Sequence, residues 1–196
     1  MSRREHVYFL IHKPFGYLSQ FSSEAGNPGL GELFDLQKDV YPVGRLDMDS
    51  EGLLILTNDS SLNKSLLDPR NQHRRTYWVE VEGLPDEIAS RELEKGVEIN
   101  LKGKKYKTMH AQVKLISPEI SEREPAVNRK KHPVTSWLEI SLVEGKNRQV
   151  RRMTAKVGHP TLRLIRVGIE DVKLGEIPIG GIVQISGKIL KKKLKL

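Results

Sequence analysis

The sequence contains no cysteine, which excludes disulfide bonds, thiolate metal sites and a cysteine nucleophile. It also lacks a long apolar run. The run near its start, residues 7–11, is too short for a signal-peptide core or a membrane span. With 37% apolar and 30% charged residues, the 196-residue chain has the composition of an ordinary globular protein. These features predict one or two domains with a hydrophobic core and a chemistry that uses no thiol.

Acidic residues are missing from two segments that carry much of the positive charge. Residues 145–169 hold seven Lys and Arg, and residues 188–196 hold five Lys, with no Asp or Glu in either. Together they carry +12, whereas the other 162 residues carry −4. Arg grips phosphate with a planar fork, so the first segment favours a nucleic-acid contact. Lys is a mobile point charge, so the second is interpreted as a solvated tail that adds unspecific RNA affinity.

The apolar pattern predicts a mixed α+β protein on a largely antiparallel sheet, because strands outnumber helices and few strand–helix–strand units appear. Strands are expected near residues 6–11, 52–57, 75–81, 97–101, 109–116, 135–143 and 162–165, with another pair in 172–190. Helices are expected over residues 29–36, 60–67, 85–96 and 147–157. Between the strands, residues 117–134 form a long polar loop, which is typical of a functional flap or a disordered insertion.

The helix predicted over residues 147–157 has two different faces. An apolar stripe, expected in the core, comprises Val150, Met153, Thr154 and Val157. A second face carries three arginines at spacings of three and four residues, namely Arg148, Arg151 and Arg152. Three guanidinium groups on one face favour phosphate binding.

The densest reactive chemistry lies in residues 44–52, GRLDMDSEG, directly before the apolar run 53–57. Asp47, Asp49 and Glu51 could ligate Mg²⁺ for nuclease or phosphatase chemistry, although alternate residues diverge in a strand and the six His show no ligand spacing. Asp and Ser could instead cap backbone N–H groups in a turn. Alternatively, an Asp kept ionised by Arg45 could be a nucleophile. The residues alone leave the three interpretations open.

Five motifs occur in a fixed order along the chain: KPFGYLSQF (13–21), GRLDMDSEGLLILTND (44–59), RTYWVEVEG (75–83), EGKNRQVRRM (144–153) and LRLIRVG (162–168). In these motifs the sequence resembles the bacterial ribosomal-RNA pseudouridine synthases of the RsuA/RluE type, over residues 13 to about 187. The resemblance implies the pseudouridine-synthase catalytic domain, a mixed and largely antiparallel sheet in two lobes with the active cleft between them. Lobe 1 would comprise residues 1–46 plus 165–196, and lobe 2 residues 47–164. Only 12 residues precede the first motif, so we expect no S4 RNA-binding module.

The resemblance also implies residue roles. Asp47 would be the nucleophile that attacks the target uridine at C1′ of the ribose or C6 of the base. Tyr77 would stack on the flipped-out base and help to remove its C5 proton, while Arg166 would pair with Asp47. Substrate contacts would come from Arg45, Leu164, Arg148, Arg151 and Arg152. Isomerisation consumes nothing, so the resemblance implies no cofactor and no metal.

The implied substrate is ribosomal RNA, and the likeness to members without an S4 module points to 23S rRNA, either free or in a partly assembled subunit. The resemblance further implies a cytoplasmic monomer with no membrane partner. Two other classes are an rRNA-binding or assembly factor without chemistry, and a metal-dependent nuclease that uses residues 47, 49 and 51. The intact set of Asp47, Tyr77 and Arg166 argues against a pure binder. One departure is Glu170, which stands where a glycine is expected.

Overall fold

The computed structural model describes residues 5–196, so the first four residues of the expected lobe 1 lie outside the described residues. The chain forms two compact units. Unit 1 comprises residues up to His73 together with Arg166–Leu196, and unit 2 comprises Arg74–Ile165. The sequence suggested a boundary near residue 46. Residues 47–73 instead belong to unit 1, because the strand that follows residue 50 pairs with the first strand of the chain.

Unit 1 is built on short antiparallel strands in the order β11-β1-β3, with β2 beside β3 and β10 beside the end of β9. Its strands are β1 (Tyr8–Lys13), β2 (Tyr41–Pro42), β3 (Glu51–Thr57), β10 (Val172–Lys173), β11 (Ile182–Gln184) and the last part of β9 (Thr161–Ile169). All seven residues of β3 are buried, as is typical of a continuous apolar run of strand length. The expected helix over residues 29–36 is only a 3-10 turn, Leu30–Glu32.

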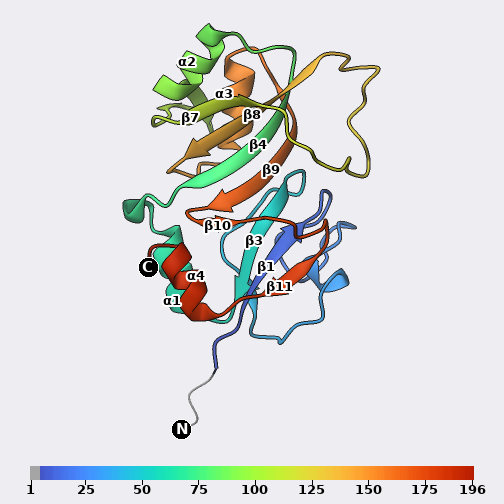
Figure 1. Cartoon of the computed structure of the whole chain (residues 1–196), viewed down its shortest axis with the longest axis vertical. Coiled ribbons are helices and arrows are strands. Elements are labelled where there is room, and N and C mark those ends of the chain that lie inside the picture. The colour runs from blue at the N-terminus through green and yellow to red at the C-terminus, as the bar shows by residue number, and fades with distance from the viewer. Residues whose placement is uncertain (1–4) are drawn as a thin grey trace. The chain divides into compact units, whose positions relative to one another are not determined.

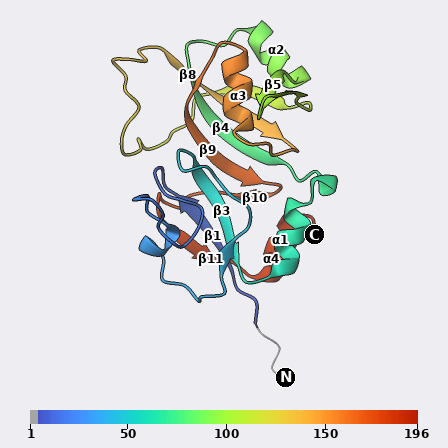
Figure 2. The ribbon, with the colours of Figure 1, turned by 180° about the vertical axis from the view of Figure 1, so that it is seen from behind.

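Two helices of unit 1, α1 (Ser60–Leu67) and α4 (Gly187–Lys193), lie side by side (Figures 1 and 2). The interpretation of residues 188–196 as a solvated tail is wrong. Leu190 and Leu194 are fully buried, because their spacing of four residues places both on one face of α4. Lys191 joins the helices through an ion pair of 2.9 Å with Asp59, the N-cap of α1.

Unit 2 contains the strands β4 (Arg75–Glu82), β8 (Thr135–Leu142) and β7 (Gln112–Ile116) in that order, and the first residues of β9. A separate two-stranded hairpin pairs β5 (Glu98–Leu101) with β6 (Lys104–Lys107), a strand that the sequence analysis missed. The helices α2 (Glu87–Lys95) and α3 (Gln149–Lys156) complete the unit. Its core gathers apolar side chains from these elements, including Val79, Leu93, Ile140, Met153 and Leu164.

The helix ends follow the local chemistry of the sequence. Asp86 caps α2 by accepting a 2.7 Å hydrogen bond from the backbone nitrogen of Ala89, as expected for an Asp before a helix. Gly96 ends α2 at φ +80°, a left-handed conformation that favours glycine. None of the helices within residues 5–196 is long and apolar enough to cross a membrane.

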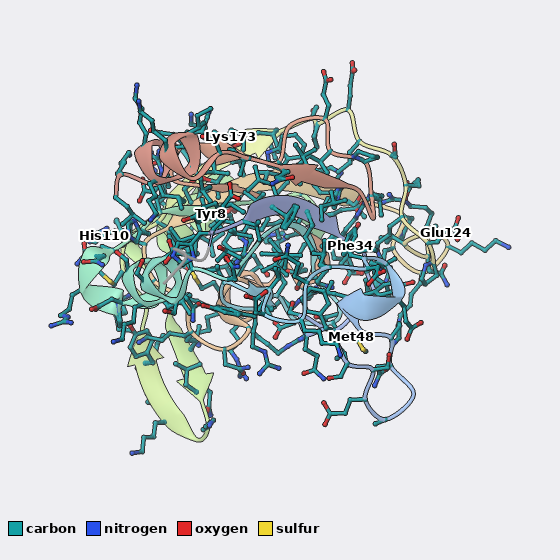
Figure 3. All side chains as sticks on the ribbon, turned by 90° about the horizontal axis from the view of Figure 1, so that it is seen from below. Tyr8, Phe34, Met48, His110, Glu124 and Lys173 are labelled. Atoms are coloured by element: carbon teal, nitrogen blue, oxygen red, sulfur yellow. The ribbon has the colours of Figure 1, made fainter. Side chains whose placement is uncertain are left out.

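Residues 117–134 form neither helix nor strand, but buried side chains fix the loop to unit 2. Arg163 is 2% exposed and donates a 2.8 Å hydrogen bond to the carbonyl oxygen of Ser121. Arg129, within the loop, forms ion pairs with buried Glu80 of β4 and with Glu122. In Figures 1 and 3 the loop extends to one side of unit 2, with Glu124 labelled on it in Figure 3. The loop is therefore anchored at several points along its length.

Candidate active site

The GRLD segment, residues 44–50, is a loop of unit 1 that its neighbours fix in place. Ser19 binds both backbone groups of Leu46: its hydroxyl donates to the carbonyl oxygen at 2.8 Å and accepts from the amide at 2.9 Å. A turn closes the loop, since the Ser50 amide donates to the Asp47 carbonyl oxygen at 3.0 Å. The segment therefore contains a backbone turn, which holds half-buried Asp47 at a defined position.

A buried lysine, Lys13, joins this segment to the KPFGY loop. Lys13 ends β1 and is 0% exposed. Its Nζ donates to the carbonyl oxygens of Pro14 and Tyr17, each at 2.7 Å, and to that of Met48 at 3.5 Å. The amide of Gly16 also donates to the Met48 carbonyl oxygen, at 2.8 Å. The buried amine of Lys13 thus fixes the backbone beside Asp47 through hydrogen bonds to carbonyl oxygens.

Four charged side chains interact with the Lys13 amine, namely Asp47, Asp49, Glu51 and Arg166. Burial lowers the pKa of Lys13 to about 8, because a charged amine loses hydration inside the protein. The carboxylates oppose this shift, Glu51 most strongly, while Arg166 adds to it. Glu51 is itself 1% exposed. Asp47 and Arg166, two of the predicted site residues, therefore belong to one cluster of charges in unit 1.

Arg166 is held rigidly on β9. It is 5% exposed, and its Nε donates a 2.8 Å hydrogen bond to the carbonyl oxygen of Leu53 on β3. Gly52, at φ +106°, packs directly against the Arg166 backbone. A side chain at residue 52 would collide there, which gives a physical reason for glycine after the GRLD turn.

Tyr77 and Leu164 belong to unit 2. Tyr77 lies on β4 opposite Ile140 and packs, half-buried, against the core on the same face as Val79. Leu164 is 6% exposed and is a member of that core. Both side chains therefore have a packing role in unit 2 in addition to the roles that the resemblance implies.

The expected arginine face is only partly formed. Helix α3 begins at Gln149, so Arg148 precedes it in a left-handed conformation at φ +50° and is exposed. Arg152 is half-buried and donates to the carbonyl oxygens of Asn147 at 3.2 Å and Asn100 at 2.8 Å. Arg151 is also half-buried. The three arginines therefore do not form one open face of a helix.

Glu170 explains the departure from the expected glycine. It occupies the tight turn between β9 and β10 at φ +48°, a conformation that glycine adopts without strain. Its carboxylate is nearly buried, 2.8 Å from Lys195 Nζ and 3.5 Å from His73 Nδ1. Glu170 thereby ties this turn to the end of the chain, which a glycine could not do.

Sequence reasoning missed Lys13 and Arg163 as buried cations. Lys13 belongs to the motif KPFGYLSQF, but none of its neighbours in the sequence indicates that its amine is buried. Arg163 was counted with the acid-free segment 145–169, yet it lies inside unit 2. Among residues 5–196, no group of three or more His, Asp or Glu is placed to hold a metal ion.

Residues 7–156 match the family model described as RNA pseudouridylate synthase. This chain belongs to that family. Two relatives named "Ribosomal large subunit pseudouridine synthase E" are similar to it. The one from Vibrio parahaemolyticus is 45% identical over 172 residues, covering 87% of this chain and 70% of that protein. The one from Xanthomonas axonopodis pv. citri is 48% identical over 169 residues, covering 84% and 86%.

A solved structure described as a pseudouridylate synthase has the same fold, with a TM-score of 0.77 and 26% identity. The match covers 98% of this chain and 76% of that one. The expected fold class, a mixed and largely antiparallel pseudouridine-synthase domain, is thereby confirmed. With its relatives and its fold in agreement, the chain is an RNA pseudouridine synthase, as the five motifs predicted.

Proposed function

We propose that this pseudouridine synthase isomerises a uridine of large-subunit (23S) ribosomal RNA, with Asp47 as the nucleophile acting on a flipped-out base. The observation that carries the proposal is the fixed position of Asp47. Asp47 lies in a turn that the Ser50 amide closes, and the preceding residue, Leu46, is hydrogen-bonded to Ser19. Asp47 also belongs to one charge cluster with Lys13 and Arg166. The relatives named for large-subunit RNA support the choice of substrate.

The reaction requires the carboxylate of Asp47 to be ionised and aimed at the uridine. Asp47 attacks C1′ of the ribose or C6 of the base, and the N-glycosidic bond breaks. The uracil turns while held, C5 bonds to C1′ and the bond to Asp47 breaks, which frees the carboxylate; the C5 proton leaves, and the nitrogen of the broken glycosidic bond takes up a proton. Arg166, fixed by its bond to Leu53, pairs with the carboxylate of Asp47.

The remaining roles follow from what the substrate needs. A base inside a helix must be extruded, at a cost of a few kcal/mol. Stacking on an aromatic ring returns about 1–3 kcal/mol, which is the role of Tyr77. Leu164 contributes an apolar contact to the uracil, and exposed Arg45 contacts the displaced strand. Phosphate contacts come from Arg148, Arg151 and Arg152. The proposed enzyme acts as a monomer, on free rRNA or on a partly assembled subunit.

The test is pseudouridine mapping in unmodified large-subunit rRNA, incubated with the protein in EDTA. We expect one uridine to be converted by the wild type and none by Asp47→Asn. The matched control is Asp49→Asn, a carboxylate two residues away in the same loop, which should retain conversion. Activity that needs Mg²⁺, or equal loss in both variants, would contradict the nucleophile and favour a metal site. RNA binding without conversion by the wild type would indicate a binding factor.

A further inference from the structure

A third acid-free segment lies in unit 2, apart from the two that the charge count first revealed. Residues 99–118 hold five Lys and no Asp or Glu. Four of these lysines, Lys102, Lys104, Lys105 and Lys107, lie in or at the turn of the β5–β6 hairpin. Like charges gathered at one turn repel one another, so lysines without a partner there lower the stability of the hairpin.

Two of the four lysines have partners within the hairpin region. Lys105 Nζ lies 3.1 Å from Glu98, and Lys107 Nζ donates to the carbonyl oxygen of Gly96 at 2.6 Å. Lys102 and Lys104 are exposed at the turn, where Lys102 adopts a left-handed conformation at φ +52°. Their amines are therefore presented to solvent at the hairpin tip.

The hairpin is held in a fixed place. Two strands alone are marginally stable in water, so the hairpin needs other contacts. The hydroxyl of Tyr106 donates to Glu144 at 2.5 Å, and this bond, with burial, raises the pKa of Tyr106 to about 12. Arg152 donates to the Asn100 carbonyl oxygen at 2.8 Å, and Ile99 is 3% exposed in the core. The hairpin is thus fastened to residues 144–152.

Lys146, in the EGKNRQ motif, adds a further cation to the same place. Its Nζ lies 5.1 Å from the centre of the Tyr106 ring, and its amide donates to the Gln149 side chain at 2.9 Å. Lys104 shares the face of β6 with Tyr106, because alternate residues of a strand point the same way. We call Lys102, Lys104 and Lys146 the hairpin surface; all three are exposed.

We propose that the hairpin surface binds phosphates of the RNA backbone. Lysine amines give a positioning contact with no reading of the base sequence, and a rigid hairpin places them at one spot. The inference rests on the proposed function in one respect, that the substrate is large-subunit rRNA. The hairpin surface thereby supplies part of the phosphate binding that the sequence predicted for Arg148, Arg151 and Arg152. Of these three, Arg152 is hydrogen-bonded to the hairpin itself, through the Asn100 carbonyl oxygen.

The test measures how the Kd for unmodified large-subunit rRNA depends on salt. The variant replaces Lys102, Lys104 and Lys146 with Gln. Each lost phosphate contact reduces the slope of log K against log salt by about 0.7–0.9, so we expect a reduction of about 2–3. The charge-matched control replaces Lys38, Lys64 and Lys95, exposed lysines elsewhere on the chain, with Gln and should leave the slope unchanged.

An unchanged slope in the hairpin variant would overturn the proposal, and so would equal reductions in both variants, because net charge alone would then account for them. The result is independent of turnover. Pseudouridine formation by the wild type, and its loss in Asp47→Asn, report on the proposed function, whereas the salt slope reports on the hairpin surface. Either can fail while the other stands.

Discussion

A Cβ atom on Gly52 would lie 2.7 Å from the backbone nitrogen of Arg166, and closer still to its carbonyl oxygen. Glycine is therefore the residue that lets β3 approach β9 at the level of Arg166. Gly52→Ala should lower the free energy of unfolding by more than about 2 kcal/mol, since it adds a backbone collision to a strained φ. Urea denaturation measures the loss.

The control for this prediction is Gly175→Ala. Gly175 has a positive φ of +58° but open space where a Cβ would go. This variant should lose only about 1 kcal/mol, the cost of the backbone conformation alone. Similar losses in the two variants would show that the contact with Arg166 is not what requires glycine at residue 52.

Lys13 should titrate near pH 8, well below the ordinary value for a lysine side chain. In protein labelled with ¹³C at lysine Cε, we expect one resonance with a midpoint near 8, and Lys13→Arg identifies it by its absence. If every lysine titrates above pH 10, the charge cluster around Asp47 has been described wrongly.

The sign of the effect of Lys13 on stability follows from that pKa. Between about pH 8 and 10.5 the folded protein has released this proton while the unfolded chain still binds it, so stability rises with pH. Because the pKa of Lys13 falls from 10.5 to about 8 on folding, the free energy of unfolding rises by about 3 kcal/mol over that window. The difference in the free energy of unfolding between the wild type and Lys13→Met, measured by urea denaturation from pH 7 to 10.5, isolates this contribution. A difference that stays constant with pH contradicts the prediction.

Asp59 should stabilise the contact between α1 and α4 through its charge. Burial alone would raise the pKa of Asp59, but hydrogen bonds from Ser61, Lys191 and Tyr8 outweigh it and hold the pKa below its usual value. The resulting stability is present above about pH 4 and is lost as the pH falls below it. Asp59→Asn should cost about 1–3 kcal/mol at pH 7, and less at pH 3.

Asp86→Asn is the matched control, because Asp86 caps α2 through the Ala89 amide. Asn caps helices about as well as Asp, so the change should stay within about 0.5 kcal/mol. Thermal or urea unfolding at both pH values compares the variants. Equal effects at the two caps would mean that Lys191 and Tyr8 add nothing to Asp59.

The end of the chain should be part of the core of unit 1. Leu194→Ala removes a fully buried side chain and should cost about 2–5 kcal/mol. Leu196→Ala, two residues later and 44% exposed, should cost under about 1 kcal/mol. If both changes are tolerated equally, α4 is not packed as described, and the tail interpretation would be restored.

The fold could be predicted from the sequence where the signal for an element lies within the element itself. The apolar run of β3 and the helix expected over residues 85–96, with Asp86 as its cap and Gly96 at its end, each carry a local signal, and each was confirmed. Helix α4 was missed because five lysines dominate residues 188–196 and hide the stripe formed by Leu190 and Leu194.

The site was predictable only as a set of motifs. Asp47 and Arg166 were found by resemblance, and their common interaction with Lys13 required the structure. The burial of Lys13 depends on loops that lie tens of residues apart in the chain, and that of Arg163 on Ser121 and Trp137 of other elements. No stretch of sequence around either residue contains that information, so the sequence analysis counted Arg163 with the cations of the segment expected to contact nucleic acid.

The division of the chain has a consequence for its biosynthesis. Unit 2 is one continuous stretch, residues 74–165, whereas unit 1 needs residues from both sides of it. Domains generally fold as units while the chain emerges from the ribosome, the earliest residues first. Here that order is partly reversed: the segment bearing Asp47 is synthesised before unit 2, whereas Arg166, Glu170 and α4 of the same unit are synthesised after it. The polypeptide therefore contains Asp47, the proposed nucleophile, long before it contains the residues that complete unit 1.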